Sequence, residues 1–92
     1  MANAIVTVKI MPVSPEVDLK AVEVIAKEKI AAFAGEGETR TSIEPVAFGL
    51  NSLSITFVMD ESIGSPDIVA DQIAELEDVN SAEISDVRRA VG

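Results

Sequence analysis

The spacing of apolar residues along the chain predicts four strands. In each of them apolar side chains recur at every second position, which is the pattern of a strand with one buried face. The predicted strands cover residues 4–11, 39–47, 51–60 and 79–89. The last strand breaks the pattern because Val87 falls out of phase with Ile84. We therefore expect a β-bulge near residues 85–86.

Two other stretches have the apolar spacing of helices. From Leu19 to Ala34 the apolar residues recur three or four positions apart, as in a helix packed on one side. This helix is expected to bury Leu19, Val22, Ile25, Ala26, Ile30 and Phe33. Ser14 or Asp18 can cap its start, and Gly35 can end it in a left-handed conformation. A second helix is expected to begin at Ser65-Pro66-Asp67 and to bury Ile68 or Val69, then Ile73 and Leu76.

The predicted element order is β-α-β-β-α-β. One apolar face per strand and one apolar stripe per helix place both helices on the same face of a four-stranded sheet. Right-handed crossovers and short connections favour a ferredoxin-like α+β sandwich with an antiparallel sheet of order 4-1-3-2. A chain of 92 residues is expected to form one domain, residues 1–92.

The bend between the second and third strands is the first candidate site. Gly49 is expected to be its pivot, since glycine tolerates positive φ. Phe48 lies at the tip, where its own hairpin cannot easily bury it. The ring therefore either contacts a partner or folds back to cap the end of the sheet.

A second candidate is Arg88-Arg89, the only adjacent basic pair in the chain. It either contacts a partner or is part of a solvated tail. In the predicted topology this pair and Phe48 lie at opposite ends of the sheet. The open face between them is expected to expose Thr7, Lys9, Arg40, Ser42, Glu44, Ser54 and Thr56.

Charge and composition exclude several functions. Sixteen acidic and seven basic residues give a net charge of −9, which repels phosphate backbones, and the open face has no aromatic ring on which a base could stack. Direct nucleic-acid binding is therefore not expected. The acidity favours either a basic protein partner or simple solubility.

The chain also lacks the side chains of common active sites. It has no cysteine and no histidine, so thiol nucleophiles, zinc–thiolate sites and the commonest general base are absent. Asp60-Glu61, or Glu36 with Glu38, could bind a hard cation, but neighbouring carboxylates in an acidic protein are usually solvated. We predict no enzyme activity, no metal and no cofactor. No apolar run reaches the ~20 residues of a membrane span and the start is unlike a secretion signal, so we expect a cytoplasmic protein that does not bind membranes.

Two stretches resemble a known family. Residues 43–50 (IEPVAFGL), with the alternating strand 53–58 and the Asp60-Glu61 turn, resemble translation elongation factor 1-beta, and residues 79–89 (VNSAEISDVRR) are similar to its archaeal branch. The resemblance implies a single guanine-nucleotide-exchange domain that promotes GDP release and GTP exchange on the GTPase elongation factor 1-alpha.

The resemblance also implies roles for the two candidate sites. The bend with Pro45, Phe48 and Gly49 would meet a second domain of the GTPase. The end of the last strand would reach toward the Mg²⁺ site, with Arg89, or Arg88 beside it, at the place of a lysine in eukaryotic relatives. The alternative interpretation is a small ferredoxin-like regulatory domain that binds a metabolite.

Overall fold

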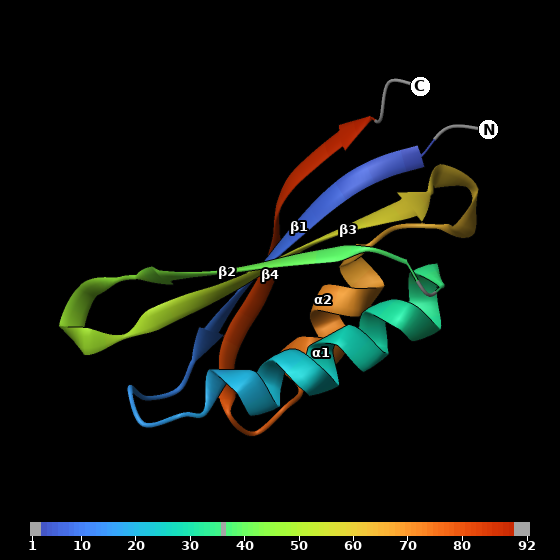
Figure 1. The fold of residues 1–92 in the computed structure, drawn as a ribbon. Coiled ribbons are helices and arrows are strands. Elements are labelled where there is room, and N and C mark those ends of the chain that lie inside the picture. The colour runs from blue at the N-terminus through green and yellow to red at the C-terminus, as the bar shows by residue number, and fades with distance from the viewer. Residues whose placement is uncertain (1–2, 36, 90–92) are drawn as a thin grey trace.

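The computed structural model describes residues 3–35 and 37–89 (Figure 1). The strands are β1 (Asn3–Pro12), β2 (Thr39–Pro45), β3 (Asn51–Asp60) and β4 (Val79–Arg89). The helices are α1 (Leu19–Ala34) and α2 (Asp67–Ala74), and single 3₁₀ turns form at Ala47–Gly49 and Glu61–Ile63. The element order is the one that the apolar spacing predicts.

The four strands form one antiparallel sheet of order β2-β3-β1-β4. This is the predicted order 4-1-3-2 read from the other edge. Both helices lie on the same face of the sheet and leave the other face open (Figure 1). The ferredoxin-like α+β prediction is confirmed.

The core lies between the helices and the inner face of the sheet. It is built by the alternating residues of the two central strands and the apolar stripes of both helices. Its members include Val6, Val8, Ile10, Leu53, Ile55, Phe57, Met59, Val22, Ala26, Ile30, Val69 and Ile73. Ile25, predicted to be buried, is 39% exposed because it lies at the flank of the α1 stripe. In α2 the buried alternative is Val69, while Ile68 is 51% exposed.

The ends of α1 follow the capping signals. Asp18 is the N-cap, and its Oδ1 accepts a hydrogen bond from the Lys20 amide at 3.0 Å. Ser14 instead accepts from the amide of Glu16 in the preceding turn. Gly35 follows the helix with φ 86°, a conformation that costs other residues energy. Of the two predicted N-caps, Asp18 is therefore the correct one.

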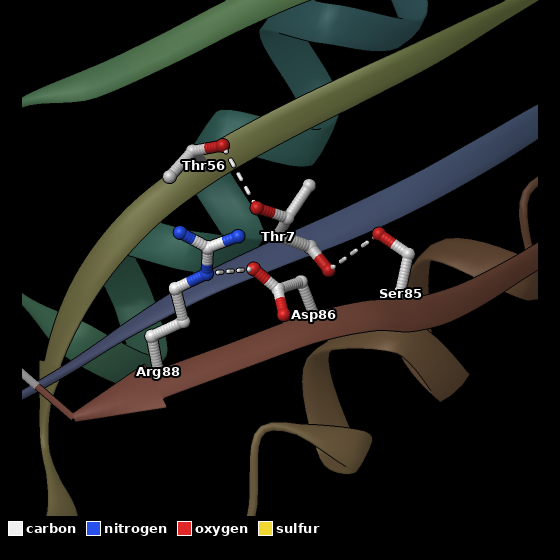
Figure 2. A network of polar contacts seen from close by, with 5 residues as sticks. All are labelled: Thr7, Thr56, Ser85, Asp86 and Arg88. Carbon is white, nitrogen blue, oxygen red and sulfur yellow. Dashed lines mark hydrogen bonds and ion pairs between the residues drawn. The ribbon is translucent and has the colours of Figure 1, made fainter.

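The predicted bulge in β4 is present. Thr7 pairs with Asp86 and Val8 with Ile84, which leaves Ser85 as an extra residue. The Ser85 hydroxyl donates a hydrogen bond to the Thr7 carbonyl oxygen at 3.3 Å, across the irregular step (Figure 2). The bulge reverses the faces of all later residues of β4, and this reversal places both C-terminal arginines.

Candidate functional site

The tip of the β2–β3 hairpin has an uncommon backbone conformation. Strand pairing ends at Pro45 and Asn51, and the Leu50 amide closes the turn by donating to the Ala47 carbonyl at 3.2 Å. Both central residues of this turn have positive φ: 62° for Phe48 and 76° for Gly49. Positive φ at both positions is the sign pattern of a type I′ turn. Gly49 was the expected pivot, but the turn requires a left-handed Phe48 as well.

The Phe48 side chain projects into solvent. It is 95% exposed, so the interpretation in which the ring caps the end of the sheet is wrong. A left-handed conformation costs a residue with a Cβ about 1–2 kcal/mol, and the ring makes almost no packing contacts that could offset this cost. Backbone strain of this kind occurs preferentially at functional sites. The structure thus presents an aromatic ring outward despite an unfavourable backbone.

Other exposed apolar residues precede Phe48 in the same hairpin. Ile43 and Val46 are 51% and 42% exposed, and Pro45 is also exposed. We call these three residues and Phe48 the hairpin tip. Figure 1 shows this end of the hairpin extending past the helix layer, which therefore cannot cover it.

The two arginines lie at the other end of the sheet. Residues 88 and 89 pair with Ile5 and Ala4, at the end of β1 farthest from the hairpin tip. The described Cα atoms extend 42 Å along the longest axis. The predicted placement of the two candidate sites at opposite ends is confirmed, while their roles stay predictions.

The arginine side chains point to different faces. Arg88 lies on the open face, where its Nε donates to Asp86 at 2.8 Å. Arg89 is on the helix side, and its Nε donates to Glu61 at 3.2 Å. Both side chains are about three-quarters exposed, at 76% and 74%. Adjacency in sequence does not make these two arginines one basic cluster.

The open face has a polar centre. The hydroxyls of Thr7 and Thr56 hydrogen-bond to each other at 3.0 Å across β1 and β3. Figure 2 shows the Arg88–Asp86 pair over the same face. The seven residues predicted for this face lie there: Arg40, Ser42 and Glu44 are exposed, and Thr7, Lys9, Ser54 and Thr56 are half-buried.

An apolar pair on the open face was missed by the sequence interpretation. Ile5 and Val58 are opposite each other in β1 and β3, and both are partly exposed. With Arg40 and Thr56 they line a shallow cavity of about 610 Å³. The signal was available, since Ile5 is in phase with Thr7 and Val58 is in phase with Thr56.

Comparison with known proteins shows which family has this architecture. Residues 5–90 match the family described as the EF-1 guanine nucleotide exchange domain. The chain belongs to the EF-1 guanine nucleotide exchange family. Similar proteins named elongation factor 1-beta occur in the archaea Methanosphaera stadtmanae, at 37% identity, and Methanobrevibacter smithii, at 39%. Each alignment covers 97% of this chain and 98% of the relative.

Asp60 and Glu61 of this EF-1 exchange-family chain have partners within the protein. Asp60 accepts a hydrogen bond from the Ser62 amide at 2.9 Å, and this bond lowers the pKa of Asp60. Glu61 accepts from Arg89. Glu36 lies outside the described residues. Among those that are described, no three acidic side chains gather as a metal site would need, and no helix is long and apolar enough to cross a membrane.

A side-chain hydrogen bond joins α1 to β2, the strand that leads to the hairpin tip. Glu23 of α1 accepts a hydrogen bond from the Thr41 hydroxyl of β2 at 3.0 Å and pairs with Lys27 at 2.7 Å. The bonds from Lys27 and then Thr41 lower the pKa of Glu23. In this exchange-family fold, α1 thus helps to fix the direction of β2.

Proposed function

We propose that this protein is a guanine nucleotide exchange factor that acts on elongation factor 1-alpha in translation elongation. The observation that carries the proposal is the match of residues 5–90 to the EF-1 guanine nucleotide exchange family. The exposed ring of Phe48 supports it, because an exposed aromatic side chain on a strained backbone fits a protein contact better than a structural role. We further propose that residues 1–92 act as a single exchange domain.

Such a factor works by binding and makes or breaks no covalent bond. It prefers the nucleotide-free GTPase. By thermodynamic linkage, the exchange factor lowers the affinity of the GTPase for GDP by the same factor by which GDP lowers the affinity of the GTPase for the exchange factor. Each tenfold loss of GDP affinity requires about 1.4 kcal/mol of preferential contact with the empty form. The protein therefore needs contacts that the nucleotide-free GTPase makes more favourably than the GDP-bound GTPase does.

The two ends of the sheet are suited to supply these contacts. In the proposal, Phe48 and Pro45 of the hairpin tip, together with the adjacent Gly49, are buried against one domain of the GTPase. Arg88 or Arg89 approaches the nucleotide and its Mg²⁺ at the other end. Because β3 runs from the tip to the opposite end without interruption, the spacing of the two contacts is held by the sheet.

The arginines can change partners at low cost. Their present ion pairs, with Asp86 and Glu61, are exposed, and exposed pairs contribute only about 0–1 kcal/mol. A guanidinium remains protonated at every physiological pH. An arginine brought near a bound cation would therefore disfavour that cation electrostatically.

The test is nucleotide release from the GTPase. Elongation factor 1-alpha is loaded with fluorescent GDP, and release is followed after adding excess GTP with or without this protein. We expect faster release with the protein present. An unchanged rate at saturating protein would contradict the proposed function.

Variants test the hairpin tip. Phe48→Ala should slow release while far-ultraviolet circular dichroism shows a folded domain. Val24→Ala is the matched control, since Val24 is also an exposed apolar residue but lies on α1. If both variants exchange at the wild-type rate, the ring is not a contact.

A double variant tests the arginines. Arg88→Ala with Arg89→Ala should reduce the exchange rate more than it reduces stability. Lys20→Ala with Lys29→Ala makes the same change in net charge on α1 and should retain activity. Full activity of the arginine double variant would remove the C-terminal end from the mechanism.

A metabolite-binding regulatory domain is the second candidate function. The cavity beside Ile5, Val58 and Arg40, of about 610 Å³, is the observation that favours it, because its volume is that of a small-molecule site. This candidate predicts that a small ligand raises the melting temperature of the protein when no GTPase is present. The exchange assay and the melting assay therefore separate the two functions.

A further inference from the structure

The outer edge of β2 offers unpaired backbone groups. Among the described residues, β2 lies at one edge of the sheet and pairs only with β3. The Val46 amide donates to the Leu50 carbonyl, so the backbone groups of residue 46 point toward β3. In an antiparallel pair this direction alternates along the strand, so residues 44, 42 and 40 also turn their backbone groups toward β3. Residues 39, 41, 43 and 45 then turn theirs outward. Pro45 fits this arrangement, because a proline has no N–H to leave unpaired at an edge.

The two edges of the sheet differ in their suitability for pairing. β4, the other edge strand, is broken by register shifts at Asn80 and Ser85, and such bulges protect an edge from strand addition. The pairing of β2 with β3 has no shift from Thr39 to Pro45. Ile43 of β2 also has its side chain 51% exposed on the helix side. β2 is therefore an edge with regular pairing and a partly apolar side, of the kind that proteins usually protect from strand addition.

The sequence of β2 is complementary to itself. Two copies laid antiparallel with Ser42 opposite Ser42 place Arg40 of each copy opposite Glu44 of the other on the open face. Thr41 then lies opposite Ile43 on the helix side, and its outward groups meet those of Ile43 in a hydrogen-bonded pair. Registers centred on Arg40 or Glu44 would put like charges opposite each other. The register centred on Ser42 satisfies backbone, charge and apolar contacts together.

We propose that this protein forms a homodimer by antiparallel pairing of β2 with β2 of a second copy, in the register centred on Ser42. The sheet then continues across both copies. The inference rests on the edge of β2 and not on the proposed exchange function, although Ile43 and Pro45 belong to both proposed surfaces. The edge is short and each copy has a net charge of −9, so the dimer is weak.

A charge exchange between positions 40 and 44 tests the register. Sedimentation equilibrium at about 0.15 M ionic strength, where the Debye length is about 8 Å, measures the dimer dissociation constant. Wild-type protein should dimerise with a constant on the order of 100 µM, as a small interface allows. Arg40→Glu and Glu44→Arg should each raise this constant about tenfold or more, since each puts like charges opposite at two places. An equimolar mixture of the two variants should restore association, because unlike charges then meet at both places.

Controls separate the register from general charge. Lys20→Glu changes the net charge as Arg40→Glu does but lies on α1, and it should keep the wild-type constant. Thermal melts confirm that each variant is folded. In concentrated wild-type protein, the amides of Thr41 and Ile43 should exchange with solvent more slowly than in dilute protein.

Three outcomes overturn the proposal. The first is a wild-type protein that remains monomeric at millimolar concentration. The second is a dimer that neither single variant weakens, which would place the interface elsewhere. The third is a Lys20→Glu variant that weakens the dimer as much as Arg40→Glu does, which would reduce the effect to net charge.

Discussion

Replacing Phe48 with asparagine should raise the stability of the protein while lowering its exchange activity. Phe48 has φ 62° and ψ 31°, a left-handed conformation that asparagine adopts at a lower energetic cost than phenylalanine does. Asn-Gly is the preferred pair at the centre of a type I′ turn. Since the ring is 95% exposed, its removal loses almost no packing. We expect a gain of about 0.5–1 kcal/mol, which corresponds to a rise of roughly 2–8 °C in Tm for a domain of this size.

The expected loss of activity follows from the same exposure. If the ring is buried against the GTPase, its contribution to binding is about 1.5–3 kcal/mol. Removing it should therefore lower the rate of GDP release, at subsaturating protein, by roughly tenfold to a hundredfold. Stability and activity would move in opposite directions at one residue.

Both quantities are measured on the same samples. Thermal melting by far-ultraviolet circular dichroism gives Tm, and release of fluorescent GDP from elongation factor 1-alpha gives the exchange rate. Val24→Ala is the control for removing an exposed apolar side chain. A lower Tm for Phe48→Asn would refute the strain argument, and an unchanged release rate would refute the contact at the hairpin tip.

Three further predictions concern the C-terminal arginines, the hydrogen bond between α1 and β2, and the core. Arg88→Ala and Arg89→Ala should each change the free energy of unfolding by less than about 1 kcal/mol, because their ion pairs are exposed. The GDP-release rate of each single variant then identifies which arginine acts. If both single variants release GDP at the wild-type rate, neither arginine contributes alone. Hydrogen bonds lower the pKa of Glu23 from its ordinary value of 4.5, so their stabilisation is present above that pH and is lost as the pH falls through the lowered pKa. Glu23→Gln should lower the free energy of unfolding at pH 7 by about 1 kcal/mol and reduce its fall below pH 4.5; acid titrations that match the wild type would contradict the stabilising role of the bonds from Lys27 and Thr41 to Glu23. Ile10→Ala, at a fully buried site of β1, should cost about 2–5 kcal/mol in urea denaturation, and a loss below about 1 kcal/mol would contradict the described core.

The sheet could be predicted because the central strands β1 and β3 each have one buried face, which imposes a period of two on their sequences. Leu53, Ile55 and Phe57 fix the phase of β3, and the rules for crossovers then leave few strand orders. The bulge in β4 could be predicted for the same reason, since Val87 is out of phase with Ile84. In both cases the positions of the apolar residues indicate directly which face of the sheet the helices cover.

Side chains at the flank of a helix stripe could not be assigned in this way. Ile25 and Ile68 have apolar side chains of the kind found in cores, yet both are exposed. Each lies beside the buried stripe of its helix, and burial there depends on whether a neighbouring element happens to reach it. That information is tertiary and is absent from the periodicity of a single helix.

The conformation of Phe48 was not predictable either. Glycine at position 49 signals one positive φ, but no sequence rule assigns a second one to phenylalanine, which rarely adopts it. The closed turn from Ala47 to Leu50 imposes it. A strained residue at a candidate contact is where local preference and function are expected to disagree.

The C-terminal arginines show how one inserted residue changes the interpretation of a motif. Side chains of neighbouring residues in a strand point to opposite faces, so Arg88 and Arg89 could never have acted from one surface of the sheet. The bulge at Ser85 decides which of them faces which way. With the bulge, Arg88 joins the open face beside Asp86, and Arg89 turns to the helix side and meets Glu61. The two guanidiniums are thus separate candidates for the contact near the nucleotide, and single substitutions are needed to tell them apart.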